Sequence, residues 1–91
     1  MSDTNPFEER TLYTINNKQG DRTTITLDKL TADALQVLFP DVHAWIQRTY
    51  DLVVERKPNL GRREHGDLVR ALANKEAHAS PIYRRMIDDL L

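Results

Sequence analysis

The sequence contains no cysteine among its 91 residues, and this absence removes several kinds of site at once. Without thiols the chain has no disulfide scaffold, no thiolate zinc site and no cysteine nucleophile, which fits a reducing compartment. No apolar run approaches the roughly 18 residues that a membrane-spanning helix needs. Residues 1–10 are polar and acidic and lack the apolar segment of a signal peptide. We therefore expect a cytoplasmic protein with no membrane partner.

The chain also has few of the residues from which catalytic and cofactor sites are built. Its three glycines lie far apart, which excludes a glycine-rich phosphate loop, and no GxSxG motif is present. The three histidines, His43, His65 and His78, do not follow a metal-ligand spacing. Asp88 and Asp89 are neighbours on an expected helix, so their carboxylates diverge by about 100° and do not converge on one ion. The sequence predicts no enzyme, no metal site and no cofactor.

Charge balance and hydrophobic content indicate one small folded domain. The chain carries 13 lysines and arginines against 14 aspartates and glutamates, and its net charge is −1. Apolar residues make up 40% of it, which is enough for a core and too much for a fully disordered chain. A domain of this size buries only about 60–65% of its unfolded surface, so its core is marginal and a second chain would help to stabilise it.

Residues 22–27, RTTITL, give the clearest strand pattern in the chain. From Thr24 onward polar and apolar residues alternate, which places the two kinds of side chain on opposite faces of the strand. The polar face carries Arg22, Thr24 and Thr26. One strand needs a partner for its backbone groups, and two partners are open. Residues 11–15, TLYTI, can fold back on it as a hairpin, or a second copy of the chain can pair with it. The second pairing explains more, because it buries Ile25 and Leu27 over the helices and sets the polar face beside that of the other copy.

The rest of the chain shows helical periodicity. The spacing of apolar residues predicts helices over about residues 29–38, 42–56, 64–77 and 81–91. Asp28, Asp41 and Ser80 are suited to cap the first, second and fourth of these helices, and Thr31 is a rival to Asp28. Trp45 lies on the apolar stripe of the second helix, so core packing explains it better than a binding site. The densest basic cluster has two interpretations, a solvated helix end or a contact to phosphate. It comprises Arg56, Lys57, Arg62 and Arg63.

In order along the chain, RTTITLD, a short helix and VHAWIQRTYDLVV resemble the ribbon–helix–helix superfamily, the MetJ/Arc-type DNA-binding fold, over residues 22–56. The resemblance implies a mainly α fold with one short β-strand, and a homodimer whose two copies pair their strands into an antiparallel ribbon. In this family the polar strand residues read bases, which carries over to Arg22, Thr24 and Thr26. The intertwined helices imply a dimer core. Its members are Ile25, Leu27, Leu35, Leu38, Trp45, Ile46, Tyr50 and Val53.

The resemblance also implies a domain organisation and a set of partners. Residues 1–21 would be an N-terminal tail, in which a short strand at 11–15 is left open. Residues 22–57 would be the DNA-binding and dimerisation unit, and residues 58–91 a helical C-terminal extension. The protein would be a small transcriptional repressor from plasmid, phage or toxin–antitoxin regulation. It would bind double-stranded DNA, a second copy of itself and, through residues 64–91, a toxin or relaxosome component.

Two further expectations complete the sequence-based hypotheses. Lys29 and Arg48 are the candidate contacts to DNA phosphates. The rival hypothesis is a protein-interaction module without a nucleic-acid role, in which a β-hairpin of residues 11–27 packs on the helices. In that case the amphipathic helix of residues 80–91 would dock into a partner's groove.

Overall fold

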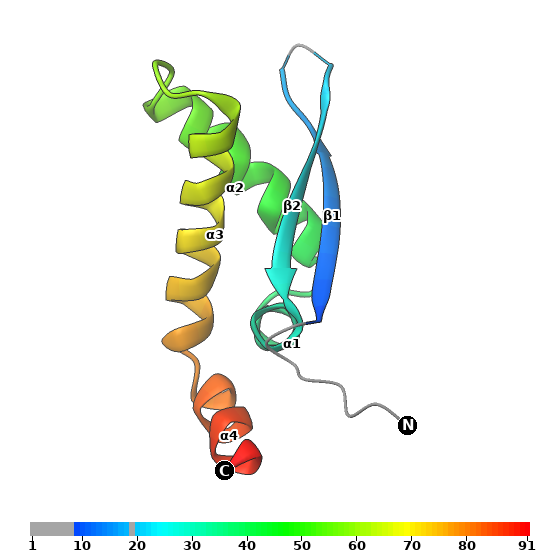
Figure 1. The fold of residues 1–91 in the computed structure, drawn as a ribbon, viewed down its shortest axis with the longest axis vertical. Coiled ribbons are helices and arrows are strands. Elements are labelled where there is room, and N and C mark those ends of the chain that lie inside the picture. The colour runs from blue at the N-terminus through cyan, green and yellow to red at the C-terminus, as the bar shows by residue number, and fades with distance from the viewer. Residues whose placement is uncertain (1–8, 19) are drawn as a thin grey trace.

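The computed structural model of this chain describes residues 9–18 and 20–91, and within them two strands precede four helices. The elements are β1 (Arg10–Asn16), β2 (Arg22–Asp28), α1 (Lys29–Leu38), α2 (Val42–Arg56), α3 (Arg62–His78) and α4 (Pro81–Leu90) (Figure 1). The prediction of a mainly helical chain is therefore confirmed. The prediction of a single strand is wrong, because part of the expected N-terminal tail is β1. The first eight residues of that tail lie outside the described residues.

The two strands pair antiparallel as a hairpin within one chain. The sequence favoured a ribbon shared between two copies, and the structure instead shows residues 22–28 paired with β1 of the same chain. Asn16 faces Arg22 at the turn end of the ladder. In the turn, the backbone N–H of Asn17 donates to the carbonyl oxygen of Asp21 (2.9 Å), and the Asn17 side chain accepts from the Asp21 N–H (2.8 Å). Gly20 has a φ of 86°, a left-handed value that suits glycine. These local bonds close the turn and let β1 fold back on β2.

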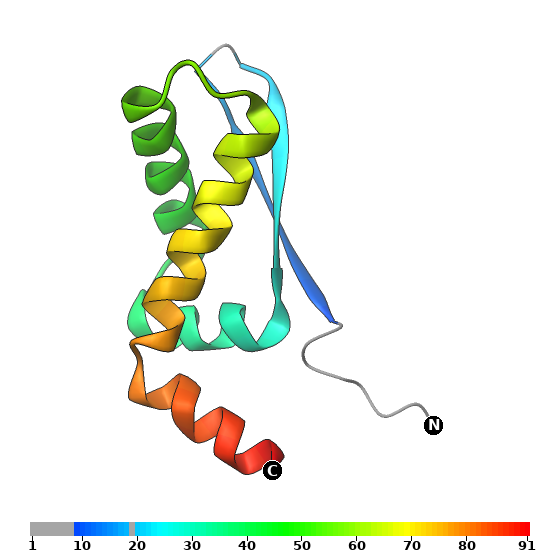
Figure 2. The same ribbon diagram turned by 60° about the vertical axis from the view of Figure 1, so that its left-hand side comes forward.

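One side of the hairpin is covered by α2 and α3, and its other side faces away from them (Figure 2). Alternation along the strands turns Ile15, Ile25 and Leu27 toward the helices, where each is at most 3% exposed. The core also takes in Val69 and Ala73 of α3. Helix α3 therefore belongs to the same folded unit as residues 22–57, although the sequence placed it in a separate extension.

Side-chain caps fix where three of the helices begin, at the residues that the sequence pattern indicates. Asp28 accepts a hydrogen bond from the backbone N–H of Thr31 (2.9 Å) at the start of α1. Asp41 does the same for Ala44 (3.0 Å) at the start of α2. Ser80 accepts from a backbone N–H of the first turn of α4 (3.1 Å). Each cap satisfies a helix donor that would otherwise lack a partner.

Helix α4 is attached to the unit through α1 and α3, and it has no fully buried residue. The rings of His78 and Tyr83 pack 4.5 Å apart, centre to centre, across the turn between α3 and α4. At its far end Leu90 and Leu91 are exposed. None of the helices seen in residues 9–18 and 20–91 combines the length and the apolar character needed to cross a membrane.

Candidate nucleic-acid interface

The side of the hairpin that faces away from α2 and α3 is here called the outer face. It carries the three side chains that the sequence predicts to read bases. Arg22 and Thr24 are exposed there, and Thr26 is half-buried. Alternate residues of a strand lie about 6.6 Å apart, so the three side chains form a row along β2. The structure thus brings the predicted base-reading residues together on one surface.

Strand β1 adds a second row to the outer face, which the sequence did not predict as part of the site. Leu12 lies opposite Thr26, Thr14 lies opposite Thr24, and Asn16 lies opposite Arg22. All three β1 residues are exposed, and Leu12 is 66% exposed. Alternation along TLYTIN would identify these three residues as one face of a strand, but only if the pairing of this strand with RTTITL were already known.

Helix α2 holds the edge of β1 through side chains that bond to its backbone. The Gln47 side chain accepts from the Asn16 N–H (3.1 Å) and donates to the Asn16 carbonyl oxygen (2.8 Å). His43 Nε2 lies 2.6 Å from the carbonyl oxygen of Thr14 and donates to it, because a carbonyl oxygen only accepts. These bonds satisfy backbone groups at a sheet edge and fix the hairpin on the helical layer. They also leave the Asn16 and Thr14 side chains on the outer face.

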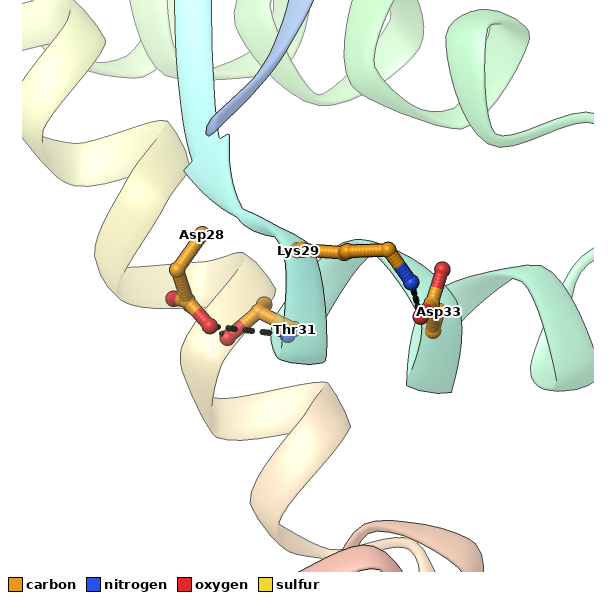
Figure 3. A network of polar contacts seen from close by, with 4 residues as sticks. All are labelled: Asp28, Lys29, Thr31 and Asp33. Atoms are coloured by element: carbon orange, nitrogen blue, oxygen red, sulfur yellow. Dashed lines mark hydrogen bonds and ion pairs between the residues drawn. The ribbon is translucent and has the colours of Figure 1, made fainter. Parts of the chain in front are cut away.

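The two predicted phosphate contacts lie on helices and not on the outer face. Lys29 begins α1 at the foot of β2, where its Nζ is 2.8 Å from Asp33 Oδ2 (Figure 3). The hydrogen bond to Asp33 and the negative charge of that carboxylate raise the pKa of Lys29. Beside it, Asp28 accepts from both the backbone N–H (2.9 Å) and the hydroxyl (2.8 Å) of Thr31. Arg48 is exposed on α2, the helix that packs behind the sheet.

Arginines do gather elsewhere, along the edge of β2 that faces α3. A groove of about 320 Å³ at this seam has Arg62, Arg63 and Arg70 among its lining residues. Arg62 and Arg63 belong to the basic cluster of residues 56–63. Arg70 was missed, because only the packing of α3 shows which side of that helix faces the strand.

The predicted dimer core is largely the core of a single chain. Six of its eight members are between 0% and 7% exposed, covered by the chain's own strands and helices. They are Ile25, Leu27, Leu35, Ile46, Tyr50 and Val53. Trp45 is half-buried and stacks on Phe39 with ring centres 5.3 Å apart, and Leu38 is 40% exposed. An interface between two copies of this fold would therefore use mainly other side chains.

The histidines have structural partners. His65 is buried, and its Nε2 donates to the carbonyl oxygen of Lys57 at 2.6 Å. His43 holds the backbone of β1, and His78 packs on Tyr83. In the part of the chain that the structure describes, no group of three or more histidine and carboxylate side chains is placed to hold a metal ion.

Comparison with known proteins gives no match. No protein-family model matches the chain, and no curated protein or solved structure is significantly similar to it. A functional assignment therefore depends on the chemistry of the outer face and its surroundings.

Proposed function

We propose that this chain is a sequence-specific double-stranded DNA-binding protein that acts as a transcriptional repressor, with the outer face of its hairpin in the major groove. The proposal depends on one observation. Arg22, Thr24 and Thr26 share the face of the sheet that turns away from α2 and α3. A two-stranded ribbon has the dimensions to enter the major groove. A face that presents donors, acceptors and methyl groups has the chemistry to read base edges there.

The side chains of the outer face match the base edges of the major groove in kind. Arg22 can donate two hydrogen bonds to a guanine, and Asn16, its cross-strand neighbour, can pair with the edge of an adenine. The threonines donate, accept or touch a thymine methyl group, and Leu12 offers an apolar contact to the same group. Each good bidentate pair contributes about 1–3 kcal/mol of discrimination against a wrong base.

The ribbon–helix–helix resemblance supports the same surface, because β2, α1 and α2 follow one another in the order that it implies. In that superfamily two copies build one ribbon, whereas here β1 supplies the second strand. We propose that each chain carries a complete ribbon and that the homodimer forms on DNA, with one ribbon on each of two half-sites. The free chain should then unfold at a urea midpoint that does not depend on protein concentration, whereas a shared ribbon would raise the midpoint with concentration.

The test begins with selection of randomised duplexes on the purified protein. Binding of the enriched sequence and of an unrelated duplex is then measured by fluorescence anisotropy at two salt concentrations. Wild-type protein should prefer the enriched sequence and should bind more weakly at higher salt.

Substitutions in the same assay assign the contacts. Arg22→Ala should weaken binding by about 1–3 kcal/mol and relax the preference at one base position. Arg84→Ala, which removes an exposed arginine from α4, is the matched control and should keep the affinity and the preference. The proposal is wrong if no sequence is enriched, or if alanine at Arg22, Thr24 and Thr26 together leaves the preference intact.

A second candidate function is the protein-interaction module, and α4 favours it. Of the predicted partner-binding segment, residues 64–91, α3 is committed to the core, which leaves α4 to meet a toxin or relaxosome component. Its apolar side chains are only half-buried, and Leu90 and Leu91 are exposed. Docking of such a helix depends on apolar contact, so its affinity should change little with salt, in contrast to DNA binding.

A further inference from the structure

Two neighbouring grooves run along the seam between β2 and α3, and together they are here called the arginine groove. The first, of about 320 Å³, is lined by Thr23, Thr24, Ile25, Arg62, Arg63, Gly66 and Arg70. The second, also of about 320 Å³, is lined by Arg10, Thr26, Leu27, Asp28, Arg70 and Asn74. Arg70 belongs to both linings, so the two grooves lie on either side of its side chain. Thr24 and Thr26 belong to the outer face as well, so the arginine groove borders the proposed base-reading surface directly.

The side chains in the arginine groove make it cationic. Four arginines line it, and its single carboxylate, Asp28, already accepts two hydrogen bonds from Thr31. Arg63 makes no ion pair with the residues that the structure describes. The groove therefore holds a guanidinium with no carboxylate to neutralise it.

The other two α3 arginines of the groove, Arg62 and Arg70, form exposed ion pairs that a phosphate can replace. Arg62 lies 3.5 Å from Asp21, and more than half of each side chain is exposed. Arg70 pairs with Asp67 one turn away on the same helix, again at the surface. Exposed pairs of this kind contribute about 0–1 kcal/mol, so a phosphate can take the place of either carboxylate at little cost.

The Arg70 guanidinium lies against Gly66 on the surface of α3. A Cβ atom built at Gly66 would lie 3.6 and 3.7 Å from the two terminal nitrogens of Arg70 and 3.5 Å from Ile25. These are ordinary van der Waals distances, so the Arg70 guanidinium lies against Gly66 and close to Ile25 of β2, at the seam between α3 and the strand.

The length of the arginine groove suits a nucleic-acid strand. Its β2 side runs from Thr23 to Asp28, about 17 Å at the rise of a strand, and its α3 side from Arg63 to Asn74 is about as long. Neighbouring phosphates of one strand are several ångströms apart, because the backbone also winds around the axis, so a groove of this length can contact more than one of them. We propose that the arginine groove binds backbone phosphates of the DNA strand that borders the ribbon, with Arg63 and Arg70 as the principal contacts. This inference rests on the proposed DNA-binding function.

The test compares Arg63→Gln and Arg70→Gln with Arg84→Gln, which removes an exposed arginine of α4 that lines neither groove. Affinity for the enriched duplex and for an unrelated duplex is measured across a series of salt concentrations. Each groove variant should weaken binding to both duplexes alike. Each should also reduce the slope of log affinity against log salt by about 0.9, the value for one lost phosphate contact. Arg84→Gln should leave the slope unchanged, and circular dichroism should show that all three variants are folded.

The outcomes separate the two proposals. If wild-type protein binds the enriched duplex but neither groove variant changes the slope, the arginine groove is not a phosphate site and base reading by the hairpin stands. The same conclusion follows if Arg84→Gln lowers the slope equally, or if a groove variant changes the ratio of the two affinities instead. If the wild-type protein binds no duplex at low salt, both proposals are wrong.

Discussion

Replacing Ile15 by alanine tests whether β1 is part of the fold. Ile15 is 0% exposed in the core, which it enters only because β1 pairs with β2. Removing a buried isoleucine side chain in this way costs about 2–5 kcal/mol, through lost burial and the cavity left behind. Small domains have a total stability of about 5–15 kcal/mol, so this change is a large share of the whole. With a urea m-value of about 1.5 kcal/mol per molar, a 3 kcal/mol loss moves the unfolding midpoint down by about 2 M.

The measurement is urea unfolding followed by the fluorescence of Trp45, which packs against the same core. Leu12→Ala is the matched control, because Leu12 lies on the same strand but is 66% exposed on the outer face. Its cost should stay below about 1 kcal/mol. If Ile15→Ala shifts the midpoint no more than Leu12→Ala does, β1 does not pack as described, and the pairing of 22–27 with a second copy becomes the better account.

Three further measurements probe the cap, the turn and an inward tyrosine. Asp28→Ala should cost about 0.5–2 kcal/mol in urea unfolding, because the N–H of Thr31 loses its acceptor, and Asp28→Asn should recover most of the loss. Gly20→Ala should cost about 1–2 kcal/mol because alanine is strained at a φ of 86°, whereas Gly20→Asn should cost less. Burial, then the charge of Asp33, raises the pKa of Tyr13 above 10.0. Its contribution to stability is present below pH 10 and is lost as pH rises through the folded-state pKa, so Tyr13→Phe should flatten the fall in unfolding free energy at alkaline pH.

The helices were predictable because their signals are local. Each of Asp28, Asp41 and Ser80 accepts from a backbone N–H two or three residues further on, and the apolar period begins directly after it. Such patterns need no knowledge of the rest of the fold. The start of α3 was displaced by two residues, since Gly61 provides no side-chain cap to mark it.

Strand β1 remained one of two alternatives because its sequence does not separate the two faces. Leu12 is apolar but lies outward, and Thr11 is polar but lies inward, so hydrophobic alternation is weak. Whether the strand pairs within the chain depends on closure of the turn. Asn17 and Gly20 supply that closure through bonds and a backbone angle that the sequence only suggests.

Only the part of the candidate site that lies on β2 was predictable from the sequence. The period of β2 alone places Arg22 on the same face as the two threonines. The partners on β1 depend on register between strands, and the contribution of Arg63 and Arg70 depends on how α3 is rotated about its axis. Cross-strand register and helix rotation arise from packing, and they cannot be derived from a periodic pattern in a single segment.

The net charge of the chain is a poor guide to what the hairpin can bind, because binding depends on where the carboxylates lie. The chain has a net charge of −1, yet the two strands together contain one carboxylate, that of Asp28. Both of its oxygens already accept hydrogen bonds from Thr31. The outer face therefore offers arginine, amide and hydroxyl groups to a polyanion, and the two strands contribute a single carboxylate charge, at the foot of β2. The arginine groove adds positive charge along one border. A nearly neutral chain can in this way offer a surface on which phosphate repulsion is small where the duplex would lie.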